Sequence, residues 1–296
     1  MRRWITIGAT TVGAVALGSA GAVAIGAWRW ERATRRAVRR LIARLPARGD
    51  ATTPATYSPE RLEGLPAPAA RYFRFALTPG QPLVRQARLR WAGEFRTRPD
   101  AAWSPFTAVQ HYTADPPGFV WDAQIRMFPR MSLLPMRVRD AYVAGEGAML
   151  GRVAALVPVV RQGGTPAMAA GSLMRYLAES VWLPTALLPS DGVRWTPVDD
   201  ATARVTLTDR ATTVAVDMHF GARGEIERVS ALRERDVDGT PVPTPWVGEF
   251  RDYERMEGMM VPRGGEVAWL LGEDDGEEPF AYWRGEVVGA RYQFGG

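Results

Sequence analysis

Apolar and polar residues alternate along much of the chain after residue 86, which is the pattern of half-buried β-strands. Between residues 87 and 96 the odd positions carry Ala87, Leu89, Trp91, Gly93 and Phe95, whereas the even positions are mostly charged. A period of two recurs over 119–127 and 136–142, and strand patterns continue over 204–208, 212–220, 225–233, 247–254, 266–271 and 281–293. About ten strands with short returns predict a largely antiparallel, curved sheet, either open or closed like a barrel.

One helix with a strong apolar face interrupts these strands. Thr165 and Pro166 form a helix-start signal, and Pro184 ends the segment. Its apolar face consists of Leu173, Met174, Leu177 and Val181. One or two shorter helices are predicted between residues 58 and 77. A single apolar helix among many strands favours an α+β fold in which the curved sheet wraps one or two helices.

The N-terminal region has a different pattern. No charged residue occurs from Ile5 to Ala27, a length that spans a bilayer core as a helix, and tryptophans flank the stretch. We therefore expect an N-terminal transmembrane helix over residues 1–28. The alternative is a cleaved signal peptide, because the stretch follows a basic start and contains Ala-x-Ala at 22–24.

The segment that follows is strongly basic. Residues 1–50 hold ten arginines and two acids, and eight of those arginines lie between 29 and 48. An apolar stripe at helical spacing predicts a juxtamembrane helix over 29–50 that lies on an anionic lipid surface. The arginines assigned to that surface are Arg32, Arg35, Arg36, Arg39 and Arg40. Their excess after the apolar stretch predicts a single-pass cell-membrane protein with a cytoplasmic domain, or alternatively an exported one.

A short linker over 51–57 separates this segment from one mainly antiparallel β domain over 58–296. The whole chain carries a net charge of +5, so the part after residue 50 is mildly acidic and does not predict nucleic-acid binding. No cysteine and two histidines are present, and no metal or cofactor motif occurs. We therefore predict no metal and no cofactor. The acidic run 273–278 is interpreted as a solvated hairpin loop.

Several segments carry a family resemblance. The most specific one runs from Arg-Tyr-Leu-Ala-Glu at 175–179 through Trp-Leu-Pro-Thr-Ala-Leu-Leu-Pro at 182–189. Together with Phe-Val-Trp at 119–121, Arg-Asp-Ala-Tyr at 139–142 and Pro-Trp-Val-Gly at 245–248, it resembles an uncharacterised bacterial domain family that often has an N-terminal membrane segment. The resemblance covers roughly residues 58–293 and implies no established activity. Its architecture is similar to the open β-barrels of lipoprotein-localisation carriers, in which a curved sheet wraps a helix.

The candidate ligand-binding residues combine polar groups with aromatic rings. They are Trp121, Asp140, Tyr142, Arg175, Tyr176, Glu179 and Trp182. We expect a membrane-anchored binding or carrier domain for an apolar ligand such as a lipid or acyl chain, without catalysis. One alternative is a hydrolase-like enzyme that uses Asp140 and Glu179 with Arg175 and Tyr176. These two carboxylates could instead have a purely structural role, in which Arg175 or Arg139 neutralises their charge. A further alternative is a structural envelope protein with a filled core.

Overall fold

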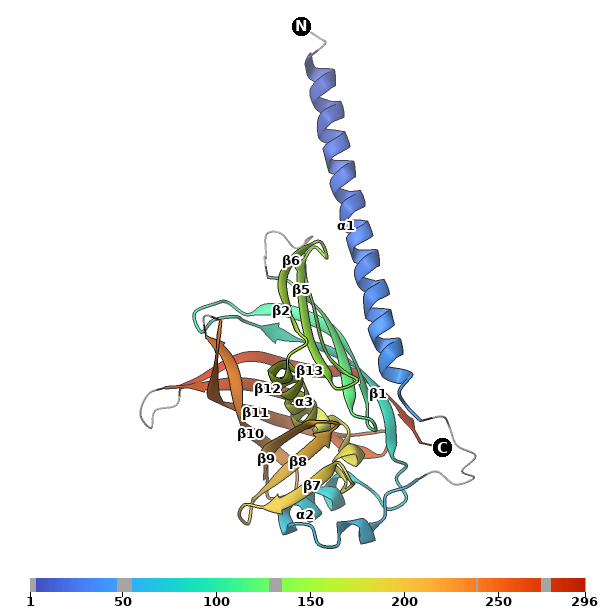
Figure 1. Cartoon of the computed structure of the whole chain (residues 1–296), viewed down its shortest axis with the longest axis vertical. Helices are drawn as coiled ribbons and strands as arrows, with labels where there is room; N and C mark the ends of the chain where they lie inside the picture. Colours follow the sequence, from blue (N-terminus) through green and yellow to red (C-terminus); the bar gives the residue numbers. More distant parts are fainter. Residues whose placement is uncertain (1–3, 47–54, 128–134, 238, 273–277, 296) are drawn as a thin grey trace.

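The computed structural model describes residues 4–46, 55–127, 135–237, 239–272 and 278–295. One thirteen-stranded sheet forms its body (Figure 1). The strands are β1 (Val84–Phe95), β2 (Ser104–Thr113), β3 (Gly118–Ile125), β4 (Met136–Val143), β5 (Glu146–Val153), β6 (Val157–Gly163), β7 (Val193–Pro197), β8 (Thr202–Asp209), β9 (Thr212–Phe220), β10 (Ile226–Val237), β11 (Thr240–Met256), β12 (Met259–Leu271) and β13 (Glu278–Phe294). The helices are α1 (Trp4–Ile42), α2 (Ala67–Ala76) and α3 (Pro166–Glu179), with short 3₁₀ turns at Pro59–Leu62, Ser180–Trp182 and Pro184–Leu187.

The sheet consists of two antiparallel meanders joined side by side. Its strand order is β6-β5-β4-β3-β2-β1-β13-β12-β11-β10-β9-β8-β7, so the first and last strands pair in the middle. The predicted curved antiparallel sheet is confirmed, but it contains more strands than the alternation indicated. Strand β6 was missed because it lies at an edge and six of its seven residues are exposed, which leaves no period of two to detect.

Helix α3 lies inside the curve of the sheet and contacts both meanders, β4 and β5 on one side and β9 and β10 on the other. Its start is capped because the Thr165 hydroxyl accepts a hydrogen bond from the Met168 amide at 3.2 Å. Gly147 of β5 permits this close approach, since a Cβ there would lie 2.3 Å from the Met168 carbonyl oxygen.

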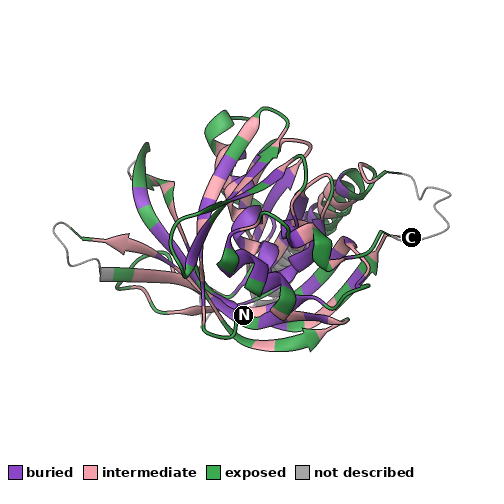
Figure 2. Ribbon diagram, turned by 90° about the horizontal axis from the view of Figure 1, so that it is seen from below, coloured by how far each residue is buried: buried purple, intermediate pink, exposed green. Residues whose placement is uncertain are grey.

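The predicted apolar face of α3 is buried against the strands. Leu173 and Val181 are fully buried and Leu177 is nearly so. Figure 2 shows the buried residues gathered where helices and strands face one another. The helix ends at Glu179, before the predicted end, and 3₁₀ turns carry the chain on to Leu187. The helix prediction is therefore confirmed, with a boundary shift of a few residues.

Helix α1 is continuous from Trp4 to Ile42, and its N-terminal part extends past the sheet (Figure 1). Its C-terminal part packs on the convex face of the sheet, opposite α3. There Leu41 is buried against Val120 and Ala141. The Trp30 indole N–H also donates to Asp122 Oδ1 at 2.7 Å. The apolar stripe of the basic segment therefore serves packing within the protein.

This arrangement corrects the membrane prediction. Among the residues that the structure describes, no helix is both long and apolar enough to cross a bilayer. The expectation of a transmembrane helix over residues 1–28, and with it single-pass membrane localisation, is therefore wrong. The physical reason lies in composition, because 12 of the 23 residues from Ile5 to Ala27 are glycine or alanine and offer little apolar area for transfer into lipid.

The short helices between residues 58 and 77 are present as predicted. The first is the 3₁₀ turn Pro59–Leu62, and the second is α2, which begins after Pro66. Helix α2 buries Tyr72 and Phe73 against the strands, and Phe73 meets Trp195 edge to face with ring centroids 6.0 Å apart. This helix therefore completes the core at the end of the sheet where β7 to β9 lie (Figure 1).

Candidate functional site

An arginine on α3 joins two carboxylates within the concave face of the sheet. Arg175 Nη1 lies 2.6 Å from Asp140 Oδ2, and Arg175 Nε lies 2.8 Å from Glu179 Oε1. Asp140 comes from β4, whereas Glu179 is one helical turn after Arg175. The side chains of Arg175 and Glu179 are about one-fifth exposed, and that of Asp140 is 6% exposed. The helix therefore brings its positive charge to a buried strand carboxylate.

Glu179 has its second oxygen satisfied by strand β2. Glu179 Oε2 accepts hydrogen bonds from the Gln110 side-chain amide at 2.7 Å and from the Tyr112 hydroxyl at 2.9 Å. These two donors are two residues apart, so they project from the same face of β2. Each Glu179 oxygen thus has a donor within hydrogen-bond distance, and the carboxylate is held as a structural anion.

The Arg175 guanidinium also lies over two aromatic rings of β3. Its Cζ atom is 5.1 Å from the ring centroid of Phe119 and 5.1 Å from that of Trp121. Trp121 is directly opposite Asp140 in the β3–β4 register, so both side chains rise from one face of the sheet. Cation–π attraction and two ion pairs therefore fix the position of this arginine.

Asp140 differs from Glu179 in having one oxygen without a partner. Among the described residues, nothing donates a hydrogen bond to its Oδ1 atom. Water does not replace that donor easily, because the residue is buried and only 4% exposed. Burial raises the pKa of Asp140, and the nearby Arg175 charge opposes that rise. Burial tends to lower the pKa of Arg175, but the Glu179 and Asp140 charges outweigh it, so that pKa is raised and Arg175 stays charged.

A second arginine reaches α3 from the opposite arm of the sheet. Arg233 on β10 donates from Nη2 to the Gly171 carbonyl oxygen at 3.1 Å. Its Cζ lies 4.8 Å from the ring centroid of Trp246 and 6.0 Å from that of Trp269. Its buried Nε atom has no acceptor within the described part of the chain. The concave face therefore contains two arginines, each held by aromatic rings.

Aromatic and sulfur-containing side chains near this charged group are only partly covered. Phe95 and Trp283 face each other across the β1–β13 pair, and the Trp269 and Tyr282 rings stack with centroids 6.1 Å apart. These four side chains and Met136 are neither buried nor fully exposed. Figure 1 shows the β1–β2 and β12–β13 hairpins continuing beyond α3. The concave face thus has a stretch of aromatic surface that α3 leaves uncovered.

The structure brings four of the seven predicted ligand-binding residues together. These are Trp121, Asp140, Arg175 and Glu179. The other three lie in separate contacts. The Tyr142 hydroxyl donates to Asp209 Oδ2 at 2.7 Å, the Tyr176 hydroxyl donates to the Thr113 carbonyl at 3.0 Å, and the Trp182 indole N–H donates to the Pro262 carbonyl at 2.7 Å.

Sequence reasoning missed the partners that complete the cluster. They are Gln110, Tyr112 and Phe119 around Arg175 and Glu179, and Arg233 with Trp246 and Trp269 on the other arm. A polar Gln110 at an inward position of β2, flanked by buried Ala108 and Tyr112, was the one available signal. Arg233 gave none, because it begins a run of four consecutive charged residues, Arg233 to Asp236, which is typical of a solvent-exposed segment.

The predicted membrane-surface arginines lie on the solvent face of α1. Arg32, Arg35, Arg36, Arg39 and Arg40 are exposed. Arg35 pairs loosely with Glu31 at 3.5 Å, and Arg32 lies over the Trp28 ring at 5.3 Å. Arg139 is turned toward α1 and donates to the Thr34 hydroxyl, so it does not neutralise the concave carboxylates. Binding of this arginine row to an anionic surface remains a prediction.

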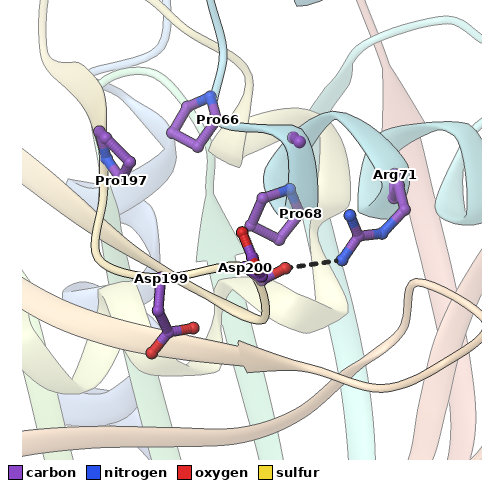
Figure 3. A pocket seen from close by; sticks show the side chains of 7 residues that line it. Pro66, Pro68, Arg71, Pro197, Asp199 and Asp200 are labelled. Carbon is purple, nitrogen blue, oxygen red and sulfur yellow. Dashed lines mark hydrogen bonds between the residues drawn. The ribbon is translucent and has the colours of Figure 1, made fainter.

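A surface hollow of about 420 Å³ lies elsewhere, between the start of α2 and the β7–β8 turn (Figure 3). Arg71 reaches across it and donates to the Asp200 carbonyl oxygen at 3.0 Å. The Asp199 side chain points away from Arg71 in Figure 3 and accepts a hydrogen bond from the Ala201 amide at 2.8 Å. The polar groups that line this hollow therefore form hydrogen bonds that stabilise the β7–β8 turn, which favours a structural role for them.

The two histidines have structural surroundings. His219 Nδ1 lies 3.2 Å from the Thr202 hydroxyl, and its Nε2 lies 2.9 Å from the Ser230 hydroxyl. Burial and the nearby Arg88 charge lower the pKa of His111 to about 4. Among the described residues, no group of three or more histidine, aspartate or glutamate side chains is placed to hold a metal ion. The acidic run 273–278 falls mainly outside the described residues.

The family comparison agrees with the resemblance found in the sequence. Residues 55–285 match the model of a family of unknown function, DUF6544, and the chain belongs to that family. No curated protein matches the chain.

Two solved structures resemble the fold. One is a LolA superfamily protein from Nitrosomonas europaea, with a TM-score of 0.40 and 8% identity, covering 77% of this chain and 92% of that one. The other is a DUF1329 family protein from Desulfovibrio piger, with a TM-score of 0.40 and 10% identity, covering 76% and 90%. Likenesses of this size do not carry a function from those proteins to this one.

Proposed function

We propose that this protein binds an apolar molecule, such as a lipid or acyl chain, on the uncovered part of its concave face. The observation that carries the proposal is the partly exposed aromatic surface formed by Phe95, Trp269, Tyr282 and Trp283. A contiguous apolar surface exposed to water costs free energy, and proteins retain such surfaces mainly where a ligand or partner covers them.

The charged cluster favours binding over hydrolysis. A general base needs a free carboxylate oxygen within reach of a proton. Both oxygens of Glu179 accept hydrogen bonds, and Asp140 Oδ2 pairs with Arg175. Asp140 Oδ1 is the one oxygen of the two carboxylates without a partner among the described residues, so the pair of free carboxyl groups that the enzyme alternative needs is not present. Tyr176, assigned to the enzyme alternative, is turned toward the Thr113 carbonyl. Asp140, Arg175 and Glu179 therefore form a fixed polar cluster beside an apolar surface.

The test uses N-phenyl-1-naphthylamine, an apolar dye whose fluorescence rises when it leaves water. The purified protein should bind the dye saturably, and a decanoyl lipid should displace it. Trp269→Ser should weaken dye binding at least several-fold because it removes one wall of the surface. Leu232→Ser is the matched control, since Leu232 is 63% exposed on the opposite face of β10.

Two results would contradict the proposal. One is the absence of saturable dye binding by a folded wild-type protein, which would favour the structural protein with a filled core. The other is equal weakening by Trp269→Ser and Leu232→Ser, which would show that the dye adsorbs to any exposed apolar group. Native mass spectrometry of the purified protein gives an independent readout through co-purifying lipid.

A further inference from the structure

Polar atoms without partners gather on the concave face. Five buried side-chain nitrogen or oxygen atoms of the described residues lack a hydrogen-bond partner, and four of them belong to Trp91, Trp121, Asp140 and Arg233. Buried polar groups in folded proteins are nearly always paired, since an unpaired one costs about 1–3 kcal/mol. Their concentration on one face therefore points to a polar group that binds there.

Two of these atoms, on residues paired across β3 and β4, form a complementary couple. Asp140 Oδ1 is an acceptor without a donor, and Trp121 Nε1 is a donor without an acceptor. The two residues are direct cross-strand neighbours on one face, and Arg175 contacts both side chains. Asp140 is 4% exposed and Trp121 is 5% exposed. A group that donates to one residue and accepts from the other satisfies both.

The charges around this couple select a neutral group. Asp140 and Glu179 carry two negative charges, and Arg175 and Arg233 carry two positive ones, so the group is balanced. A carboxylate or phosphate would lie beside Asp140 Oδ1 and be repelled by its negative charge. An ammonium would lie beside Arg175 and be repelled by its positive charge. A hydroxyl both donates and accepts and adds no charge.

We infer that the ligand is a neutral, hydroxyl-bearing amphiphile, whose hydroxyl group bridges Asp140 Oδ1 and Trp121 Nε1 while its apolar chain covers the partly exposed aromatic surface. This inference rests on the proposed function and adds the chemical class of the ligand. A glycerol or sugar head on an acyl chain belongs to this class.

The test compares three ligands with one ten-carbon chain in dye displacement, below the concentration at which they form micelles. They are 1-monodecanoylglycerol, which has two hydroxyls, methyl decanoate, which has the same ester and no hydroxyl, and decanoate, which is charged. Wild-type protein should prefer monodecanoylglycerol over methyl decanoate by about tenfold, the ratio expected for hydrogen bonds that the methyl ester cannot make. Decanoate should bind more weakly than monodecanoylglycerol.

Two variants locate the preference. Trp121→Phe removes the indole N–H and keeps an aromatic ring beneath Arg175. Asp140→Asn turns its amide oxygen to Arg175 and so presents an NH₂ group where the acceptor stood. Each variant should bring the preference for monodecanoylglycerol over methyl decanoate close to one. Trp195→Phe is the control, because Trp195 is a buried tryptophan whose N–H donates to the Leu187 carbonyl, and the preference should be retained.

The outcomes separate the inference from the proposed function. Equal binding of monodecanoylglycerol and methyl decanoate to wild type would overturn the hydroxyl inference and leave apolar binding intact. Tighter binding of decanoate would show an anion site instead. An unchanged preference in Trp121→Phe and Asp140→Asn would overturn the inference, because it would show that the hydroxyl does not contact these two residues. Dye binding without displacement by any of the three lipids would overturn the inference, whereas no dye binding at all would overturn the proposed function.

Thermal melting of each variant identifies any that fail to fold. Trp121→Phe and Asp140→Asn each test the inference independently, so one folded variant is sufficient.

Discussion

Arg175 Nη1 and Asp140 Oδ2 lie 2.6 Å apart, although the two residues are 35 positions apart in the chain and belong to a helix and a strand. The pair ties the helix inside the sheet to one arm of it. On the other arm, Arg233 holds the same helix through the Gly171 carbonyl. Charged groups therefore attach α3 to both meanders, in addition to the packing of its apolar face.

Replacing Arg175 with alanine should destabilise the protein by about 3–5 kcal/mol, because two carboxylates would be left without their buried counter-charge. Urea unfolding followed by tryptophan fluorescence measures the change. Arg204→Ala is the control, since Arg204 pairs with Asp217 but its side chain is 53% exposed, and about 1 kcal/mol or less is expected. Equal losses in the two variants would show that the concave pair behaves like a surface pair.

Docking of α1 on the convex face should depend on Trp30 and Leu41. Trp30→Phe removes the hydrogen bond to Asp122, and Leu41→Ala empties the contact with Val120. Both changes should speed tryptic cleavage after the arginines of α1, because a released helix is more often open to protease. Trp28→Phe, at a residue 53% exposed, should leave the cleavage rate unchanged. Identical cleavage rates in all three variants would argue against docking.

Acidification should destabilise the protein partly through His111. Its pKa of about 4 in the folded state lies below the unfolded value, so between about pH 6.5 and 4 the unfolded chain binds more protons. Stability from this group is therefore present above pH 6.5 and is lost as pH falls through that window. His111→Gln should flatten the decline in melting temperature from pH 7 to pH 4. A decline as steep as in the wild type would exclude His111 as a contributor.

The exposed arginine row of α1 should bind an anionic surface. Arg35, Arg36, Arg39 and Arg40 replaced together with glutamine should weaken binding to phosphatidylserine-containing vesicles by about 1 kcal/mol per arginine at low salt. A control variant changes four exposed arginines elsewhere, namely Arg194, Arg228, Arg255 and Arg291. If both variants lose binding equally, net charge rather than the α1 row is responsible.

The sequence by itself determined the local elements. Alternation such as that from Ala87 to Phe95 specified strands and their buried face, since strand side chains point to opposite sides in turn. The apolar positions Leu173 and Leu177 specified a helix that must be covered by other elements. These signals are local, so they survive in a single sequence and predicted most of the sheet and the helix within it.

Only the tertiary structure decided what those elements contact. The uncharged stretch from Ile5 predicted a membrane helix, but α1 continues through the arginines and packs Leu41 on the sheet. Asp140 and Arg175 were candidate residues from sequence, whereas Gln110, Trp246 and Arg233 joined them only through strand order. Distances across a sheet depend on which strands pair and in what register, and that depends on burial summed over the whole chain rather than on any one segment.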